Sequence, residues 1–464
     1  MKEDRIIILG AGCAGLAAAW RLRQKGQDVL ILEREDHVGG LAGGIVLGGN
    51  VYEYGPHIIH TTDPEILADI KDLMGPELVT CPRSVRVKFM GNYFKFPLSI
   101  RDVLVKLPLW TVFMAGVSLV FRLTTGFLFK PREENSETIL RRYYGDVLYK
   151  LFFRDYILRV WGIPASAFSP AFARERIPKM NIMESMQKLT TALRRRMGEA
   201  SGPLKTSGFV ENVSGDLYTT KLGFSMITQK MADRLTAAGG EVSLNSEVLR
   251  LEHDGSRVTG VVVKRGGGTE TLPCRAVINT LPINEMTRSF QPDLGPEAAE
   301  AAKALRYRAT VFVGIKVNRT KVLPASFMYF REHAFNRVTD LSWFGQKIEP
   351  EGCTLLVAEV NCDPSEKLWN DEPLVKEMVI ADLVREDLLR REEILESHLF
   401  RSRNAYPLYT LHYEKSLAVL LKRLSAFKNF ETTGRQGRFQ YVNTHVAMKM
   451  GNEAAELLLA RLNS

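Results

Sequence analysis

The first 32 residues of the sequence contain two short apolar runs, separated by a glycine-rich turn and a helical stretch. Residues 5–9 (RIIIL) and 29–32 (VLIL) have the length and composition of buried parallel strands. Residues 10–15 (GAGCAG) follow the first run and lead into an alanine- and leucine-rich stretch that ends near Gly26. The pattern predicts a strand, a tight turn, a helix and a second, parallel strand.

The turn and the acid that closes this unit form the dinucleotide-binding βαβ fingerprint. Gly10 permits the tight turn, Gly12 lets the backbone approach a pyrophosphate, and Gly15 lets the helix and strand pack closely. The first helical turn, which includes Ala14, offers free N–H groups and a positive dipole end to phosphates. Glu33 stands directly after the second strand, where it is placed to accept hydrogen bonds from a ribose.

Further strand patterns recur in the middle of the chain. Residues 240–251 alternate like strands, and residues 276–282 (AVINTLP) form a buried strand with a sharp end. Residues 85–98 predict a β-hairpin that turns at Gly91-Asn92. Strand patterns at 83–98, 308–317, 325–331 and 354–361 predict a mixed or antiparallel second sheet, with helices from about 100 to 200 covering it.

With 464 residues the chain is too long for one core, so two intertwined domains are expected. We predict an α/β fold, in which a three-layer, Rossmann-like nucleotide domain is combined with an α+β substrate domain. The predicted segments are 1–80, 206–290 and 426–464 for the nucleotide domain and 81–205 and 291–425 for the substrate domain.

Composition narrows the range of partners. The net charge of +9 indicates an anionic partner, but no helix-turn-helix, RNP or zinc-finger pattern accompanies it, so nucleic acid is not expected. The five cysteines are scattered without a CxxC pair, which disfavours a disulfide framework, a zinc site and a redox dithiol. We therefore predict no metal site and a cytoplasmic protein that takes a small-molecule substrate, anionic or lipid-linked. The pattern leaves the oligomeric state open.

One apolar segment raises the question of membrane contact. Residues 107–121 (LPLWTVFMAGVSLVF) carry no charge, and Lys106 and Arg122 bound them. A spanning helix needs about 20 apolar residues, so this run is too short to cross a bilayer. We expect buried or substrate-lining helices here. The alternative, which stays open, is a monotopic patch within 107–129 that contacts the inner face of the cell membrane.

The residues after the second strand narrow the choice of cofactor. Residues 33–40 (EREDHVGG) add the pair Gly39-Gly40 beyond the ribose acid. This run resembles the extended FAD fingerprint of glutathione-reductase-like flavoproteins, in the branch that holds amine oxidases, protoporphyrinogen oxidases, phytoene desaturases and UDP-galactopyranose mutases. The resemblance implies FAD as the cofactor. It also implies contacts with FAD by Arg34, Leu41, Val248, Thr280, Gly434, Arg435 and Asn443, with Val248 beside the adenine and Arg34 along the adenosine or pyrophosphate; the alternative for Arg34 is a solvated surface arginine.

A second motif resembles one found in UDP-galactopyranose mutases. Residues 52–61 (YEYGPHIIHT) are similar to the mutase segment that lies against the isoalloxazine ring. Gly55 and Pro56 fix a sharp turn, which aims His57 rather than leaving it mobile. His57 and His60 are the candidate catalytic residues; the alternative is that the two histidines cap a loop.

The resemblance extends over nearly the whole chain and suggests substrate contacts. Residues 144–164 and 172–177 resemble a signature of bacterial mutase-like FAD proteins. The candidate substrate-binding residues are Arg174, Arg176, Trp161, Trp343 and Tyr406. Surface salt bridges are the alternative role for Arg174 and Arg176. Leu41 departs from the arginine of amine oxidases, and His445 stands where relatives carry an aspartate.

Three functions are compatible with these residues. The first is an FAD-dependent oxidoreductase, in which a substrate C–H or N–H bond passes a hydride to flavin N5. Its substrate would be polyprenyl, porphyrin-like or glycan-linked. The second is a mutase-like isomerase, in which reduced N5 attacks an anomeric carbon and later releases it. The third is an FAD-binding scaffold without catalysis. The absence of a Ser-His-Asp or paired-carboxylate pattern agrees with hydride transfer, which we rank first.

Overall fold

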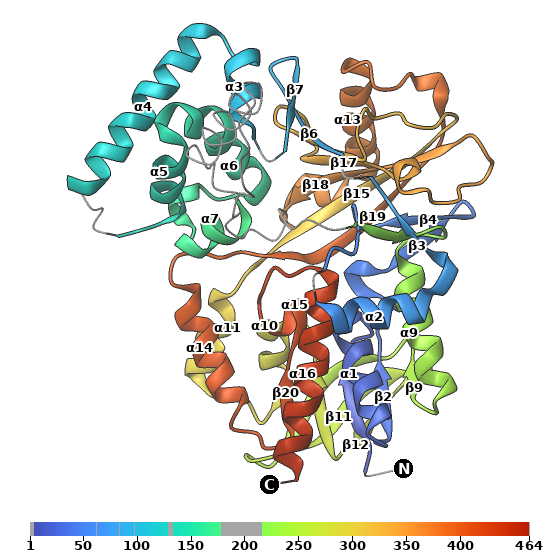
Figure 1. Cartoon of the computed structure of the whole chain (residues 1–464). Helices are drawn as coiled ribbons and strands as arrows, with labels where there is room; N and C mark the ends of the chain where they lie inside the picture. The colour runs from blue at the N-terminus through green and yellow to red at the C-terminus, as the bar shows by residue number, and fades with distance from the viewer. Residues whose placement is uncertain are drawn as a thin grey trace, which may run out of the picture.

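The computed structural model describes residues 4–61, 63–82, 84–96, 98–128, 133–177 and 216–463. It has two tiers, as Figure 1 shows. The lower tier holds both chain ends and a parallel sheet, and the upper tier holds a larger sheet beside a group of helices. The mixed helix and strand fold with a parallel sheet confirms the predicted fold class. The predicted domain boundaries stay predictions.

Five short parallel strands form the sheet of the lower tier. Their order is β20-β13-β1-β2-β9, so strands from the beginning, middle and end of the sequence lie side by side. The bounds are β1 Ile6–Leu9, β2 Val29–Leu32, β9 Glu241–Ser243, β13 Ala276–Asn279 and β20 Phe430–Thr432. Both strands predicted at the start of the chain are confirmed.

Both faces of this sheet are buried, which explains its unbroken apolar runs. Ile6 and Ile8 pack with α1, α9 and α16, whereas Ile7 and Leu9 pack with a second, four-stranded sheet. Helices, sheet and second sheet therefore make the three predicted layers. The bounds are α1 Cys13–Gln24, α2 Pro64–Met74, α9 Ser225–Ala237 and α16 Thr444–Leu462 for the helices, and β10 Glu247–His253, β11 Val258–Arg265, β12 Gly268–Pro273 and β14 Phe290–Gln291 for the second sheet.

A seven-stranded mixed sheet forms the upper tier, as the four strand patterns predict. Its order is β19-β15-β18-β17-β16-β6-β7, and the pair β16 and β6 is parallel. The bounds are β6 Val85–Phe89, β7 Asn92–Lys95, β15 Tyr307–Val317, β16 Phe327–Phe330, β17 Arg337–Asp340, β18 Thr354–Cys362 and β19 Ile394–Pro407.

The hairpin of β6 and β7 turns one residue earlier than predicted. Asn92 is already the first residue of β7 and pairs with Phe89. The turn residues are Met90 and Gly91, with φ of 48° and 70°. Two positive φ angles in a row match the right-handed twist of the flanking strands.

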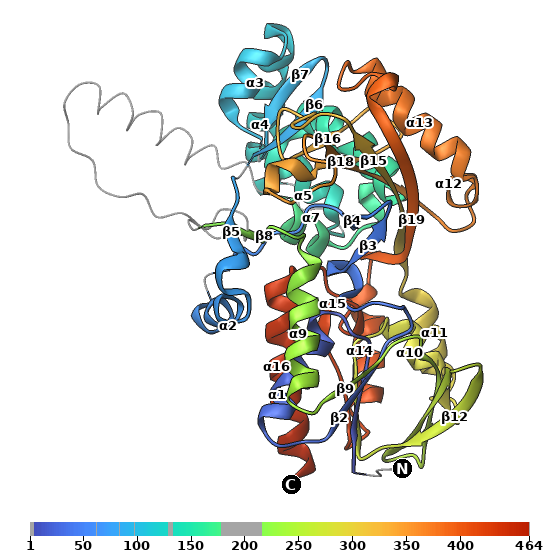
Figure 2. The same ribbon diagram turned by 90° about the vertical axis from the view of Figure 1, so that its right-hand side faces the viewer.

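Helices cover one side of the upper tier (Figures 1 and 2). Their bounds are α3 Ile100–Lys106, α4 Leu109–Leu128, α5 Ser136–Leu148, the π-helical turn η3 Tyr149–Arg154, α6 Asp155–Trp161 and α7 Pro170–Arg176. Residues 178–200, where further helix was predicted, lie outside the described residues. No helix among the described residues is long and apolar enough to cross a membrane.

The expectation that residues 107–129 form buried or substrate-lining helices is wrong for α4, which has exposed side chains and contributes none of its described residues to the lining of the ligand cavity. Leu109 is 84% exposed and Trp110 is 71% exposed, and Phe113, Val117 and Val120 are exposed as well. Among the described residues, helix α4 packs mainly on α5 and runs along the outer edge of the molecule (Figure 1). An apolar helix with one neighbour buries only the side that touches that neighbour.

The other elements of the described residues belong to one tier or the other or lie between them. Two small antiparallel pairs are β3 Gly44–Leu47 with β4 Asn50–Glu53, and β5 Leu78–Thr80 with β8 Tyr218–Thr220. The remaining helices are α10 Ile283–Arg288, α11 Pro296–Ala304, α12 Lys367–Asn370, α13 Glu372–Arg385, α14 Tyr413–Leu424 and α15 Gly434–Gly437, and the 3₁₀ turns are η1 Gly40–Ala42, η2 Gly75–Glu77, η4 Ala165–Ala167, η6 Leu341–Phe344 and η7 Arg391–Glu393.

Candidate functional site

A cavity of about 730 Å³ opens at the carboxyl ends of β1, β2 and β13 and reaches into the upper tier. This is the position at which open α/β sheets bind ligands. Of the residues predicted to bind cofactor or substrate or to take part in catalysis, those lining the cavity are Gly10, Gly12, Ala14, Glu33, Arg34, Gly39, Gly40, Leu41, Pro56, His57, His60, Thr280, Tyr406, Gly434, Arg435 and Asn443. Their individual roles stay predictions.

The turn after β1 requires its glycines. Gly10 has φ +96°, and a Cβ there would lie 2.7 Å from Thr280 Oγ1. A Cβ on Gly15 would collide with the carbonyl oxygen of Gly10. Gly12 is the N-cap of α1 and supplies no side-chain cap. The first N–H groups of α1 therefore point toward the cavity without a capping side chain, which suits a phosphate group.

Glu33 is held in place by the backbone at the end of β2. Its Oε2 accepts a hydrogen bond from Ala11 N at 2.8 Å, and its Oε1 accepts one from Glu35 N at 3.0 Å. These bonds tie the acid to the turn that follows β1. Arg34 is exposed at the cavity rim, where its guanidinium pairs with Glu35 Oε1 at 2.8 Å.

The pair Gly39-Gly40 lies against the glycine turn that follows β1. Gly39 N donates to Ala11 O at 2.8 Å, and Gly39 has φ +112°. A Cβ on Gly39 would lie 2.5 Å from Gly43 Cα. On the other side, a Cβ on Gly434 would lie 2.7 Å from the Cβ of Ala14. Glycines on both sides thus leave a narrow channel between backbone segments, which fits an extended dinucleotide.

The loop 54–60 carries the two predicted catalytic histidines. His57 lies with its ring 5.3 Å from that of Phe224, and its Nδ1 is 3.8 Å from Oε2 of the buried Glu53. Glu53 Oε1 accepts a hydrogen bond from Phe224 N at 2.5 Å. His57 Nδ1 is buried and has no hydrogen-bond partner among the described residues. Its ring is therefore held by packing, with a nitrogen still able to bind a ligand.

A buried ion pair beneath this loop is absent from the sequence predictions. Arg337 on β17 donates to Glu359 on β18 at 2.6 and 2.9 Å, and Tyr406 donates to Glu359 at 3.2 Å. A Cβ on Gly55 would lie 2.6 Å from Glu359 Oε1, so the loop rests directly on the pair. Burial opposes the charge on Arg337, but the adjacent carboxylate raises the pKa of Arg337 above its ordinary value. Burial and the Glu359 charge raise the pKa of Tyr406.

One sequence signal does mark this ion pair. Glu359 is the single acid in β18 and lies among the buried apolar residues of 355–360, where a buried acid requires a partner. Arg337 gives no comparable signal, because β17 has four residues and follows β16 after a short loop.

A cluster of arginine and aromatic side chains forms one wall of the cavity and the layer behind it. Arg435 lies 4.2 Å from the ring centre of Tyr441, and Arg176 lies 3.9 Å from the same centre. Trp161 makes an edge contact with Tyr406 at 5.3 Å between ring centres. Burial lowers the pKa of Arg176 to about 10. Tyr406 and Tyr441 line the cavity, whereas Arg176 and Trp161 lie behind them.

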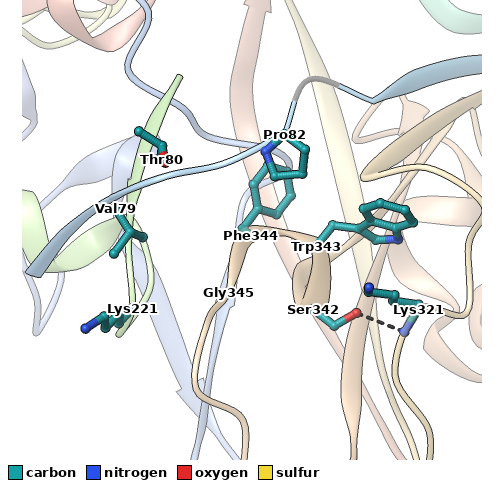
Figure 3. A pocket seen from close by; sticks show the side chains of 9 residues that line it. All are labelled: Val79, Thr80, Pro82, Lys221, Lys321, Ser342, Trp343, Phe344 and Gly345. Carbon is teal, nitrogen blue, oxygen red and sulfur yellow. Dashed lines mark hydrogen bonds between the residues drawn. The ribbon is translucent and has the colours of Figure 1, made fainter. Parts of the chain in front are cut away.

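The other predicted site residues lie outside the cavity lining. Arg174 is exposed and pairs with Glu134, and Val248 lies on β10 of the four-stranded sheet. Trp343 belongs to a separate, shallower hollow of about 450 Å³, which Figure 3 shows with Lys221 and Lys321. Its indole donates to Leu323 O at 3.0 Å. The predicted residues outside the cavity lining are Gly15, Gly55, Trp161, Arg174, Arg176, Val248 and Trp343.

The upper part of the cavity combines apolar walls with positive charge. Aromatic residues of the seven-stranded sheet and its loops form the walls, and Arg401 and Arg403 lie beside Trp369 at one side. The aromatic residues lining it include Phe96, Phe312, Phe327, Tyr329 and Phe344. Among the described residues, no cluster of His, Cys, Asp and Glu is arranged to hold a metal ion.

The sequence of this chain is similar to a family of known proteins. Residues 13–413 match the profile of flavin containing amine oxidoreductases. The chain is 26% identical over 188 residues to a probable UDP-galactopyranose mutase of Klebsiella pneumoniae, across 38% of this chain and 46% of that protein. This match therefore spans about half of the mutase. This chain is also 23% identical to protoporphyrinogen oxidase 2 of Arabidopsis thaliana, across 100% of this chain and 95% of that protein.

A solved structure has the same fold. The crystal structure of reduced UDP-galactopyranose mutase superposes with a TM-score of 0.81 at 21% sequence identity. The superposition covers 98% of this chain and 96% of that chain. The shared architecture thus extends through both tiers.

Proposed function

The chain belongs to the family of flavin-containing amine oxidoreductases, and on that basis we propose that it is an FAD-dependent oxidoreductase. The observation that carries the proposal is one continuous cavity that joins the glycine turns to the aromatic-lined part in the upper tier, with His57 in its lining. FAD supplies the acceptor for a hydride from a substrate C–H or N–H bond. The protein residues bind, orient and shield the reactants.

The dinucleotide part of FAD fits the channel between the two glycine segments. Gly12 and the first turn of α1 would hold the pyrophosphate, and Glu33 would hold the adenosine ribose. Arg435 and His57 would hold the ring portion, because each lines the cavity with a buried nitrogen that has no hydrogen-bond partner among the described residues. A bound flavin would satisfy such nitrogens.

The upper chamber favours a substrate with an apolar body and an anionic group. Phe312 and Phe327 offer apolar surface, and Arg401 and Arg403 offer positive charge. We propose a lipid- or glycan-linked small molecule, bound by a cytoplasmic enzyme. The buried pair of Arg337 and Glu359 orients Tyr406 toward this chamber through the hydrogen bond to Glu359.

The first experiment is a visible spectrum of the purified protein, with the released cofactor identified by mass spectrometry. We expect the two absorbance bands of oxidised flavin and the mass of FAD. The protein is then reduced with dithionite under anaerobic conditions and exposed to oxygen. Fast reoxidation indicates an oxidase, and slow reoxidation indicates a dehydrogenase with another acceptor. A protein that stays colourless after reconstitution with FAD contradicts the proposal.

A mutase-type isomerase is the second candidate, favoured by the cationic side of the cavity. Arg401 and Arg403 next to Trp369 suit a diphosphate joined to an aromatic base. Incubation of the dithionite-reduced protein with UDP-galactopyranose separates the two candidates. Formation of the furanose isomer without net oxidation supports the isomerase, and the absence of product leaves the oxidoreductase as the assignment.

A further inference from the structure

Helices α3 and α4 present an apolar surface on the outside of the molecule. We define the α3–α4 face as the exposed large apolar side chains of these two helices up to Leu123. Val105 is 73% exposed, and the most exposed residue, Leu109, lies four positions further along the chain. The residues of the face are Leu104, Val105, Leu109, Trp110, Phe113, Met114, Val117, Val120, Phe121 and Leu123.

The exposure of this face does not reflect a loosely attached helix. On its inner side, α4 packs so closely on α5 that a Cβ on Gly145 would lie 2.6 Å from Ser118 Oγ. Ser118 Oγ also accepts a hydrogen bond from Val147 N at 3.2 Å. At the same end of α5, Arg122 pairs with Asp146 at 2.9 Å. Helix α4 is therefore fixed, and it holds a contiguous apolar ridge in solvent, as interaction surfaces do.

The sequence around the face is strongly basic. Residues 81–130 contain eight Lys or Arg and one acid, Asp102, which gives a sequence net charge of 8 − 1 = +7. Two of these cations, Arg122 and Lys88, pair with acids outside the segment, Asp146 and Glu386. Asp102 is itself paired with Lys106 at 2.7 Å. Lys95 and Arg101 are exposed at the end of the face formed by α3. An apolar ridge bordered by positive charge is complementary to an anionic lipid surface.

The same charges disfavour a second copy of the chain as the partner. Two copies meeting through this face would combine the positive charges of both chains, including Lys95 and Arg101, with no added negative charge. Like charges at a contact are repulsive, whereas anionic headgroups compensate them. Trp110 and Phe113, stacked at 5.6 Å between ring centres, also match the preference of aromatic side chains for the membrane interface.

The face lies next to one wall of the ligand cavity. Val85 and Phe96 line the cavity, and α3 follows after the N-cap Ser99. The hydrogen bond from Lys95 N to Asp102 at 2.7 Å joins the hairpin to α3. A surface resting on this face would therefore lie close to the upper chamber.

We propose that the α3–α4 face docks the protein on an anionic lipid bilayer, with α4 lying in the plane of the interface. The proposal goes beyond the reaction proposed above. Its test measures binding rather than turnover, so the two proposals can fail separately.

The test is cosedimentation of the full chain with vesicles of phosphatidylcholine, with or without phosphatidylglycerol. We expect the protein to bind the anionic vesicles and to dissociate as salt is raised. The double substitution W110S and F113S should weaken binding by about tenfold or more, because it removes apolar area from the interface. The control pair L395S and L457S replaces exposed leucines on β19 and α16 and should leave binding unchanged.

The charge reversals K95E and R101E test the electrostatic part of the proposal. Together they should weaken binding to anionic vesicles by about tenfold and leave binding to phosphatidylcholine alone unchanged. The matched control, K415E with K428E, reverses two exposed lysines at α14 and the loop after it. Circular dichroism spectra of all variants establish that they remain folded.

Three results would overturn the proposal. Failure of the wild type to bind either vesicle removes its basis. Unchanged binding by the W110S and F113S variant shows that another surface contacts lipid. Light scattering that finds a dimer in the wild type and a monomer in this variant, without vesicle binding, assigns the face to self-association instead.

Discussion

Helices α1 and α4 are both rich in apolar residues, but they have opposite surroundings. Eight residues of α1 are buried, because sheet strands cover one side of the helix and α16 covers another. Helix α4 has only α5 as a close partner among the described helices of comparable length, and its large side chains face solvent. Residue size accounts for the difference better than apolarity does. Ala14, Gly15 and Ala17 allow close approach from several directions, whereas Trp110 and Phe113 prevent it.

The largest expected effect comes from truncating one leucine in each helix. Leu16→Ala empties a fully buried position in α1 and should lower the free energy of unfolding by about 3 kcal/mol. Leu109→Ala truncates a side chain that is 84% exposed and should change the free energy of unfolding by less than about 0.5 kcal/mol. Urea unfolding of both variants measures the difference. Equal losses would mean that α4 is buried in solution.

Two glycines, one packed against α1 and one in α4, test the same difference in packing. A Cβ on Gly451 of α16 would collide with Ala14 O, so Gly451→Ala should cost about 2 kcal/mol through overpacking. Gly116 of α4 has no neighbouring atom within 4 Å of an added Cβ, so Gly116→Ala should stabilise the helix by about 0.5–1 kcal/mol. Thermal unfolding should shift in opposite directions. A stabilising Gly451→Ala would contradict the close packing of α1 and α16.

A smaller effect, on the affinity for FAD, is expected from a substitution at Glu33, the acid that follows β2. Glu33→Gln keeps the size of the side chain but removes the charge that accepts hydrogen bonds from Ala11 N and Glu35 N. We expect the Kd for FAD to rise about tenfold, which corresponds to about 1.4 kcal/mol. Fluorescence titration of the apoprotein measures it. The control Glu351→Gln, in an exposed loop, should not change the Kd.

The smallest effect is a pH dependence near the start of α16. Burial, with a further contribution from His60, lowers the pKa of His445. The unfolded chain then binds a proton at higher pH than the folded chain, so stability is present above about pH 6.5 and falls as the solution is acidified. His445→Phe should reduce the loss of stability between pH 7 and pH 5 by less than about 1 kcal/mol. If the variant loses as much stability between pH 7 and pH 5 as the wild type, other groups cause the acid sensitivity.

The sequence alone predicted the parts of the molecule whose constraints are local. Residues 29–32 form β2 as expected, and Glu33 stands at the cavity, because a glycine turn and two buried strands leave few alternatives. The exposure of α4 depends on which elements lie beside it, which no local pattern encodes. The pairing of Arg337 with Glu359 depends on strand order in the seven-stranded sheet for the same reason.

The parallel sheet also constrains how the protein can be made. Strand β1 is synthesised more than 400 residues before β20, although both strands belong to the same sheet. At about 5–20 residues per second, roughly 20–80 s pass after β1 is made before the edge strand β20, which pairs with β13, can complete the sheet. During synthesis its apolar residues lack part of their final cover. Nascent chains of this protein should therefore depend on chaperones until residue 432 and helix α16 have emerged.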